Sequence, residues 1–486
     1  MTFSMGTRFF RRIMPRYEQD ETINFAKADH IEMTAHTENG NAGMKHSEPD
    51  APNGHLPSYE SGVTLVKSPS SSGAPVRKYI SAWDAGWNIT NAIQGMFLVA
   101  LPYAVLHGGY WSLFFLLFAA AVTCYTGLLL VDCLYDVDPF TGEKIRVRET
   151  YVDIAREVWG ARFAARIVYT AQFIELIMTC ILYLVLCGDL MDSTFQTSFP
   201  LKSWTIICCF FVLPCAFLIN LKAVSRLSFG CTVAHIIINV VILGYCLTKA
   251  NNWQWKEVDY RINIHDFPVS LGIVIFSYTS HIFLPTLEGS MSNRDDFKTM
   301  MYWTHGAAGF FKMLFAYLCY LVWGRDTSDV ITDNLTSEGF KGFVNIFLVI
   351  KALLSFPLPY YAAIELLERA FFLGKPTTVF PSCFASDGYL HVWALFLRSL
   401  PIVFTLVLAI YIPHFGVLMG LIGSFTGTML SFVWPCWFHL KIKWHVTTWY
   451  YKILHFCIIL TGTACGSIGL IYSIEALLLA YKNGDV

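Results

Sequence analysis

The sequence predicts an all-α membrane protein, and this prediction depends on composition, on the length of the apolar stretches and on two interrupted stretches. Of the 486 residues, 55% are hydrophobic and 14% charged, with a mean hydropathy of +0.49. The apolar residues fall in stretches of about 20 or more, enough for a helix to cross a bilayer. One transmembrane domain, residues 81–482, therefore accounts for most of the chain.

Residues 1–80 have a different composition and are predicted to form a disordered cytoplasmic tail. Ser, Pro, Gly and Asn are frequent there, and charges of both signs occur without apolar periodicity. The chain does not open with an uninterrupted apolar segment of the kind found in signal peptides. The first span is therefore expected to direct its own insertion.

Eleven transmembrane helices are expected, with boundaries set by hydropathy and by Gly and Pro. The expected spans are 83–107, 111–132, 165–190, 204–221, 227–248, 267–291, 302–323, 340–366, 390–412, 416–440 and 450–481. Between the second and third spans, residues 151–159 place apolar and charged side chains on opposite faces of a helix, which predicts a short interfacial helix.

The distribution of basic residues predicts the orientation of these spans. With the amino terminus inside, the cytoplasmic loops carry more Lys and Arg than the opposite loops, as the positive-inside rule requires. An odd number of spans then places Val486 on the lumenal side. The sequon Asn334-Leu335-Thr336 falls in the lumenal connection between the seventh and eighth spans, so Asn334 is the predicted glycosylation site.

The first and sixth spans are interrupted where a membrane helix should continue. Gln94 and Gly95 interrupt the first, residues 277–281 interrupt the sixth, and each interruption is followed by a proline. Lipid cannot satisfy the freed backbone groups, so broken helices occur where protein or water encloses them, which is where transporters hold their cargo. Breaks five helices apart indicate a five-plus-five inverted repeat with one extra helix.

Such breaks are suited to a zwitterionic amino acid. The amino ends of half-helices carry partial positive charge for a carboxylate, and the carboxyl ends offer carbonyl groups to an ammonium ion. We expect the substrate site to include Asn91, Gln94 and Gly95 in the first break. Close packing of helices would also explain Gly95, and a hydrogen bond between helices would explain Asn91 and Gln94.

The second break contributes Ser277, Tyr278 and Thr279 to the expected site. Tyr278 offers a flat apolar face and a hydroxyl group that can close over a small solute, although aromatic packing alone would also explain it. His281 follows this break, and we consider it as a proton-coupling residue against the alternative of a structural histidine.

Glu175 is the most informative ionisable residue, because it lies in a span that is otherwise apolar from Phe173 to Leu186. A carboxylate there can take up a proton from an acidic compartment and release it on the neutral side, so we expect it to couple protons or to contact the substrate amine. The alternative is a structural ion pair with Lys312 or Lys351. Glu288, near the end of its span, is expected to serve a gate or a helix cap.

The sequence also argues against other classes of protein. The formal net charge of −1 does not suggest a nucleic-acid partner, and the 14 cysteines show no C-x-x-C spacing for a metal or redox site. A disulfide between Cys187 and Cys208 or Cys209 is left open. No catalytic constellation is found, so neither an enzyme, a metal site nor a cofactor is expected.

Several runs resemble the amino acid/auxin permeases. They are NITNAIQG at residues 88–95 with LPY at 101–103, and the sixth-span run 276–291. Residues 82–87, 107–110 and 174–183 resemble the members of that family that carry inhibitory amino acids into vesicles. The resemblance covers roughly residues 80–480.

The resemblance implies alternating access and the loading of GABA and glycine from the cytosol into synaptic vesicles, in exchange for protons. Chloride coupling is left open, and sorting partners would bind the amino-terminal tail. Sodium-coupled relatives use the residue at Asn91, but Met96 and Phe97 here replace their small residues after Gly95, which disfavours sodium. The nearest alternative is a proton-coupled symporter of the plasma or lysosomal membrane; a nutrient sensor and an anion channel are further alternatives.

Overall fold

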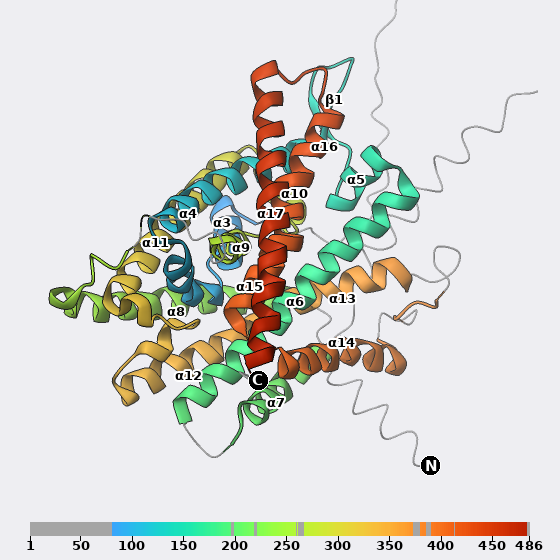
Figure 1. Ribbon diagram of the computed structural model, residues 1–486. Coiled ribbons are helices and arrows are strands. Elements are labelled where there is room, and N and C mark those ends of the chain that lie inside the picture. The colour runs from blue at the N-terminus through green and yellow to red at the C-terminus, as the bar shows by residue number, and fades with distance from the viewer. Residues whose placement is uncertain are drawn as a thin grey trace, which may run out of the picture. The chain divides into compact units, whose positions relative to one another are not determined.

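The computed structural model describes residues 80–195, 199–217, 221–258, 260, 267–372, 380–384, 390–412 and 414–483, apart from the side chains of 161–165, 221–229 and 483. Apart from Ile80, the predicted tail lies outside the described residues. The described chain is almost entirely helical (Figure 1).

The first predicted break is present. Helix α3 (Ala82–Ile93) begins at a capping box formed by Ser81 and Asp84, and its last turn ends at Gln94 and Gly95. A short 3-10 segment, η2 (Met96–Ala100), leads into α4 (Leu101–Asp132). Gly109 interrupts α4 with a φ of 55°, a conformation that favours glycine, and so divides the expected first span from the second.

The second predicted break is also present. Helix α9 (Phe267–Phe276) stops before the polar run, and the chain resumes as α10 (Leu284–Gly289) with Pro285 in its first turn, where a proline loses no helical hydrogen bond. Helix α11 (Asp296–Trp323) follows.

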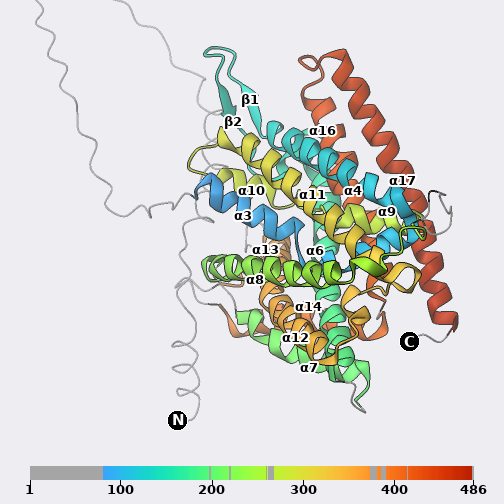
Figure 2. The same ribbon diagram turned by 90° about the vertical axis from the view of Figure 1, so that its left-hand side faces the viewer.

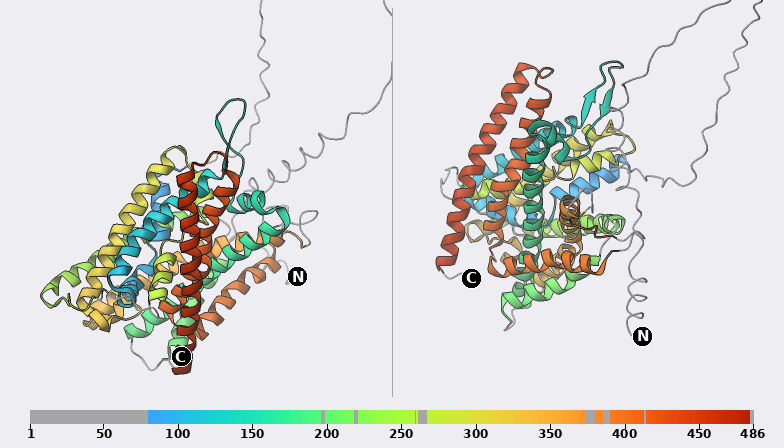
Figure 3. Two further views of the ribbon diagram at one scale, coloured as in Figure 1. Left: turned by 45° about the horizontal axis from the view of Figure 1, so that its top comes forward. Right: turned by 90° about the vertical axis from the view of Figure 1, so that its right-hand side faces the viewer.

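A β-hairpin, which the sequence analysis did not predict, connects the second span to the predicted interfacial helix. Strands β1 (Tyr135–Val137) and β2 (Lys144–Arg146) pair antiparallel, with Tyr135 opposite Arg146. Helix α5 (Tyr151–Trp159) occupies the predicted residues and begins at a capping box formed by Thr150 and Asp153. The hairpin projects beyond the helices (Figure 3). We call the end of the molecule that carries it the hairpin face.

The remaining elements follow the predicted spans, with two differences. They are α6 (Ala161–Phe195), α7 (Leu201–Val212), η3 (Leu213–Phe217), α8 (Leu221–Thr248), η4 (Ala250–Asn252), η5 (Gly324–Asp326), η6 (Ile331–Asn334), α12 (Glu338–Ser355), α13 (Pro357–Phe371), α14 (Val392–Tyr411), α15 (Phe415–Ile422), η7 (Gly423–Gly427), η8 (Met429–Val433), α16 (Trp434–Ile442) and α17 (Trp449–Asn483). The expected eighth span is divided into α12 and α13 at Phe356, just before Pro357, and the expected tenth contains the two π-helical segments η7 and η8.

Eight stretches of the described chain are long and apolar enough to cross a membrane. The first of them, Ala82–Asp132, includes both the first break and the turn at Gly109. Two shorter apolar segments, Leu201–Phe217 and Phe267–Phe276, accompany these eight. The length and composition of the helices are therefore those of a protein that crosses the membrane several times.

The broken helices lie inside the helix assembly. Helix α4 packs against α9 and α11, while α6 packs against α7, α12 and α13. Helix α17 runs along α9, α15 and both π-helical segments (Figures 1 and 2). Helices α9 and α15 approach so closely that a Cβ atom on Gly272 would overlap the carbonyl oxygen of Gly420, so the contact requires glycine.

Candidate functional site

Glu175 of α6 lies where the second break meets the π-helical segment η7. Its side chain is buried, and the hydroxyl group of Thr426 donates a hydrogen bond to Glu175 Oε2. The Thr279 side chain, from the break itself, lies beside the same carboxylate. Glu175 Oε1 has no hydrogen-bond partner in the described part of the chain. One carboxylate oxygen is therefore held by the protein while the other remains available.

The geometry of η7 explains why Thr426 reaches the carboxylate. A π-helical turn contains an extra residue and rotates the side chains that follow it, and such turns are frequent at functional sites. Hydrogen bonds in this segment follow the wider pattern, since the Thr428 backbone N–H donates to the carbonyl oxygen of Gly423, five residues before it. The sequence analysis missed Thr426. The signal was the small and polar run GSFTGT at residues 423–428, inside an otherwise apolar span.

Lys312 of α11 contacts the second break and does not pair with Glu175. Its Nζ atom donates to the carbonyl oxygen of Ser277 and lies 3.1 Å from the Ser277 hydroxyl oxygen. The same atom lies 3.6 Å from the centre of the Tyr278 ring, a cation–π distance. The lysine therefore caps the carboxyl end of α9, where backbone carbonyl groups carry partial negative charge.

Tyr278 is fully buried under this lysine. Its hydroxyl group has no hydrogen-bond partner among the described residues, and it lies 3.6 Å from where a Cβ atom on Gly309 would be. Ser277 donates its own hydroxyl proton to the carbonyl oxygen of Val274 at 2.8 Å. Ser277 and Tyr278 thus contact Lys312, whereas Thr279 lies beside Glu175.

His281 lies on the side of the break that faces α4 and α11. Its Nε2 atom is 3.0 Å from the Thr126 hydroxyl oxygen, and the other histidine whose charge reaches it is His305. No hydrogen bond or ion pair joins His281 to Glu175 among the described residues. The two predicted proton-coupling residues therefore occupy separate environments around one break.

The first break reaches the second through Phe97, which the sequence analysis did not select. The Phe97 ring lies 5.0 Å from Phe276, the last residue of α9, and 5.3 Å from Tyr183 of α6. Gln94 and Gly95 are buried next to it, and Asn91 is partly buried. The atoms nearest to a Cβ atom on Gly95 would be those of Phe97 and Ala92, so a tight contact with another helix does not explain this glycine.

Lys351 of α12 is the other lysine considered as a partner for Glu175, and it lies too far away. Helices α6 and α12 run antiparallel, because Asn345 Nδ2 lies 3.4 Å from the Leu190 carbonyl oxygen while Ser355 lies beside Tyr183. Ser355 and Tyr183 therefore lie at one level of the helix pair. Lys351 lies four residues from Ser355 toward one end of the pair, and Glu175 lies eight residues from Tyr183 toward the opposite end. The helical rise then separates their levels by about 18 Å.

Glu288 of α10 is held by residues of the hairpin face. The Tyr135 hydroxyl donates to Glu288 Oε1, and Arg146 Nη1 lies 3.5 Å from Oε2. Arg146 Nη2 also donates to the carbonyl oxygen of Pro285 at 2.8 Å. Burial and the neighbouring carboxylate raise the pKa of Tyr135 to about 12, so it remains a proton donor at neutral pH. We call Tyr135, Arg146 and Glu288 the α10 network.

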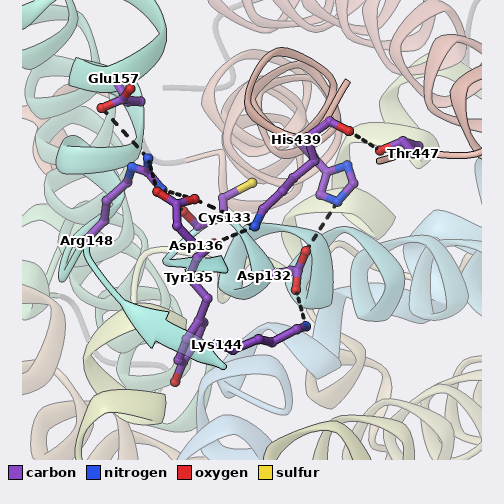
Figure 4. Close-up of polar contacts among 10 residues, drawn as sticks. Asp132, Cys133, Tyr135, Asp136, Lys144, Arg148, Glu157, His439 and Thr447 are labelled. Carbon is purple, nitrogen blue, oxygen red and sulfur yellow. Dashed lines mark hydrogen bonds and ion pairs between the residues drawn. The ribbon is translucent and has the colours of Figure 1, made fainter. Parts of the chain in front are cut away.

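Further ion pairs connect the hairpin to α4, α5 and α16 (Figure 4). Asp132 lies 3.0 Å from Lys144 and 3.6 Å from His439, and Arg148 pairs with Asp136 at 2.9 Å and with Glu157 at 3.8 Å. Lys443 donates to the carbonyl oxygen of Tyr135 at 2.5 Å. The hairpin is thus attached to several helices at one face of the molecule.

Asn334 and the cysteines, for which other roles were considered, can also be located. Asn334 is partly buried in η6, where its amide nitrogen donates to the carbonyl oxygen of Asp326 at 2.7 Å and its amide oxygen accepts from the Ser328 backbone at 2.8 Å. All fourteen cysteines are free thiols, including Cys187 and Cys208. Within the described residues, no group of three or more His, Cys, Asp or Glu is placed to hold a metal ion.

Two broken helices around a buried carboxylate, in a helical protein with several membrane-length helices, are typical of a membrane carrier. Residues 78–478 match the model of a protein family described as transmembrane amino acid transporter protein. The chain belongs to this family. The prediction of a transporter rather than an enzyme is therefore confirmed.

Individual relatives agree with the family. The chain is 50% identical over 423 residues to the vesicular inhibitory amino acid transporter of Xenopus tropicalis. The aligned region covers 86% of this chain and 80% of that protein. The human protein of the same name is 50% identical over 83% of this chain and 77% of its own length. The vesicular GABA transporter of Caenorhabditis elegans is 43% identical over 84% of this chain and 82% of its own. The predicted resemblance is confirmed.

Proposed function

We propose that this protein loads GABA and glycine from the cytosol into synaptic vesicles by exchange for protons. The names and 43–50% identity of the relatives support this substrate and this compartment. The observation within the molecule that carries the proposal is Glu175, a buried carboxylate beside a broken helix. One of its oxygens has no hydrogen-bond partner among the described residues. That oxygen can accept either a proton or the ammonium group of an amino acid.

The architecture that we propose is eleven spans arranged as a five-plus-five inverted repeat with α17 as the extra helix. The turn at Gly109 separates the first two spans, and the broken pair α9 and α10 forms the sixth. Equivalent pairs then make equivalent contacts. Helix α3 packs on α8 as α9 packs on α15, and α6 packs on α15 as α12 packs on α8.

The orientation follows from the distribution of basic residues. We place the hairpin face and the amino-terminal tail, residues 1–80, in the cytosol, with the transporter domain spanning 81–482. Val486 and Asn334 then lie on the lumenal side, and Asn334 would carry the glycan. Sorting partners would meet the cytosolic tail.

The substrate would bind between the two breaks. Its ammonium group would contact Glu175, beside Thr279, and its carboxylate would face the interrupted first span at Asn91, Gln94 and Gly95. Ser277 and Tyr278, fixed by Lys312, would form the wall of the site on the opposite side of the second break. Lys312 already donates to the Ser277 carbonyl oxygen at the end of α9. The substrate amine would therefore be directed to the Glu175 carboxylate instead.

Coupling would arise because a proton and an ammonium group compete for Glu175, with His281 as a second proton-coupling residue. Alternating access would bring Glu175 to the acidic lumen and then to the neutral cytosol, as the first, second, sixth and seventh spans move against the third, fourth, eighth and ninth. Each pH unit supplies about 1.4 kcal/mol per proton. Each 100 mV adds about 2.3 kcal/mol per charge moved.

The test uses the full-length protein in proteoliposomes that are acidic inside. Wild-type protein should concentrate GABA and glycine, and Glu175→Gln should abolish this concentration, because an amide neither titrates nor attracts an ammonium group. Full concentrative uptake by Glu175→Gln would reject the proposed role. Uptake of substrate together with protons, rather than against them, would favour the symporter instead.

A further inference from the structure

A group of titratable side chains meets at the end of the molecule opposite the hairpin face. Helix α11 begins seven residues after α10, which the hairpin holds, and runs for 28 residues. The segment that follows it, residues 324–337, therefore lies at the opposite end. The first span, which begins beside α10 at Ile80, also ends there, at the turn at Gly109. We call residues 324–337 the α11–α12 connection.

The α11–α12 connection is fixed near both of its ends. Near its start, the Arg325 backbone N–H donates to Glu257 Oε2 at 3.0 Å. Near its end, Lys341 Nζ of α12 lies 3.1 Å from Asp333 Oδ1. Segment η6, within the connection, contacts η2 and α6 as well as α12. The connection therefore touches both the segment that follows the first break and the helix that carries Glu175.

Asp329, in the middle of the connection, reaches two further helices. Hydrogen bonds from the Gly416 backbone and from the Tyr103 side chain act on its carboxylate. A Cβ atom on Gly416 would lie 3.3 Å from Asp329 Oδ2 and 3.0 Å from the Tyr103 ring, so the three elements touch here. The amino end of α15, to which Gly416 belongs, carries partial positive charge that favours a carboxylate. One side chain thus joins α4, just after the first break, to α15.

This contact lies next to the residues that connect the two breaks. Phe415, the neighbour of Gly416, stacks on Phe97 with ring centres 6.2 Å apart and 25° between the ring planes. Phe97 in turn contacts the end of α9, as described above. A separation of α15 from α4 would therefore also move Phe415 relative to Phe97. The state of the Asp329 contact decides how tightly this side of the candidate site is closed.

Other titratable groups surround the Asp329 carboxylate, and all of those that contact it directly are only partly buried. The charged and titratable groups that face it are Tyr103 and His107 of α4, His414 just before α15 and Asp189 of α6, with Asp333 and Lys341 beside Asp189. Partial burial leaves these groups within reach of protons from the side opposite the hairpin face.

The direction of the pH effect follows from this environment. Burial raises the pKa of Asp329, and the hydrogen bond from Gly416, the two histidines and Tyr103 lower it by less. Release into water would return the carboxylate to its ordinary pKa. The closed contact therefore binds a proton more tightly than the released carboxylate does, and by linkage acid favours the closed contact. A proton on His107 or His414 acts in the same direction, because a charged imidazole attracts the carboxylate.

We propose that Asp329 is a proton-sensitive gating residue: protons from the side opposite the hairpin face strengthen its contact with Tyr103 and Gly416 and so close the candidate site on that side. The proposal rests on the proposed function for its direction, since that side is then the acidic lumen. Exchange for protons requires such a step, because the carrier must close toward the lumen once it has released cargo and taken up protons. Asp329 would link that closure to the same acid that protonates Glu175.

The test measures hydrogen exchange of residues 327–337 in the purified full-length protein at about pH 7.5 and about pH 5.5, corrected for the pH dependence of chemical exchange. Wild-type protein should become more protected in acid, about tenfold for one unit of pKa difference between the closed and the released forms. Asp329→Asn should show equal protection at both values, because an amide still accepts the Gly416 N–H but does not titrate.

Asp326→Asn is the matched control, because Asp326 is an exposed carboxylate of the same connection. It should keep the wild-type response. His414→Gln removes one of the charges that reach Asp329, so it should reduce the response, and it replaces Asp329→Asn if that variant does not fold. Glu175→Gln should keep the full response, since the proposed effect originates at Asp329.

Two results would overturn the proposal. The first is protection in wild-type protein that does not rise in acid, or a wild-type rise in Asp329→Asn. The second is loss of the response in Glu175→Gln, which would assign the effect to protonation of Glu175. Because exchange is measured without transport, a flat profile leaves the proposed function intact. Full concentrative uptake by Glu175→Gln would reject the proposed function and leave the pH response of the Asp329 contact intact.

Discussion

At the scale of single residues, the carboxylate of Glu175 is the centre of the candidate site. Its surroundings are hydroxyl groups rather than a cation, since Thr426 donates to one oxygen and Thr279 lies beside it. A lysine in that place would keep the carboxylate charged and occupied. Hydroxyl groups hold its position without a paired cation, which is what the proposed exchange of a proton for an ammonium group requires.

Replacement of Thr426 by valine tests this arrangement, because valine keeps the shape and removes the donor. A hydrogen bond to a charged group contributes about 1.5–3 kcal/mol, so uptake of GABA at low concentration should fall roughly ten- to a hundredfold. Thr428→Val is the matched control, since its hydroxyl bonds only the backbone of its own segment. Equal uptake by Thr426→Val and wild-type protein would show that the carboxylate does not need this hydrogen bond.

At the scale of helices, the half-helix α9 depends on groups that other helices supply. The carboxyl end of α9 is capped by Lys312 from α11, and its opposite side rests on α15 through glycine contacts. A half-helix that ends inside the protein leaves carbonyl groups without partners, which the surrounding helices must satisfy.

Lys312→Met should impair transport at least tenfold, because the uncapped end of α9 loses an ammonium group that touches both Ser277 and the Tyr278 ring. Lys312→Arg should not restore it, since the larger planar guanidinium does not fit a site built for a compact ammonium group. Lys298→Met is the control, because Lys298 is an exposed lysine of the same helix that lies 5.9 Å from the Tyr302 ring. Uptake of GABA into proteoliposomes is the measurement, and normal uptake by Lys312→Met would contradict the capping role.

Gly272→Ala should destabilise the protein although it adds one methyl group. The added carbon would overlap the Gly420 carbonyl oxygen, and overpacking of this kind typically costs about 1–3 kcal/mol. Gly244→Ala provides the comparison, because a Cβ atom at Gly244 meets nothing within 4 Å. Thermal unfolding in detergent should show a lower Tm for Gly272→Ala alone; identical values for the two variants would mean that α9 and α15 can separate freely.

At the scale of the whole molecule, polar contacts hold the two broken helices together at the hairpin face. The hairpin face is connected by ion pairs and by the α10 network, which joins the second break to the hairpin. The chain just before α3 pairs with the chain just after α10, since the Ile80 amide donates to the Ser290 carbonyl oxygen at 2.8 Å. Both broken helices are therefore tied together at the hairpin face.

Arg146→Gln should loosen the attachment of α10 to the hairpin. The arginine and Glu288 are largely buried, with side-chain exposures of 13% and 2%. Loss of the cation leaves the carboxylate with the more exposed Arg294, whose Nε lies 3.8 Å from Glu288 Oε1, as its cationic neighbour among the described residues. Hydrogen exchange in residues 284–292 should accelerate at least tenfold, which corresponds to about 1.4 kcal/mol. Lys144→Gln is the control because its ion pair with Asp132 is exposed. Unchanged exchange in Arg146→Gln would show that the α10 network does not hold α10.

The sequence by itself determined the membrane class, the approximate spans, the short helix at residues 151–159 and the position of both breaks. These are local properties, because hydropathy, glycine, proline and polar runs act on the segment that contains them. It also identified Glu175 as exceptional, since a carboxylate inside an apolar run is conspicuous without a structure.

Only the tertiary structure decided which groups meet. It placed Thr426 rather than Lys312 or Lys351 against Glu175, gave Lys312 to the end of α9, and joined the two breaks through Phe97. These contacts depend on the rotation and register of long helices and on the π-helical turns of η7. Packing against neighbouring helices sets both, because a hydrophobic span can satisfy its own backbone equally well in any rotation.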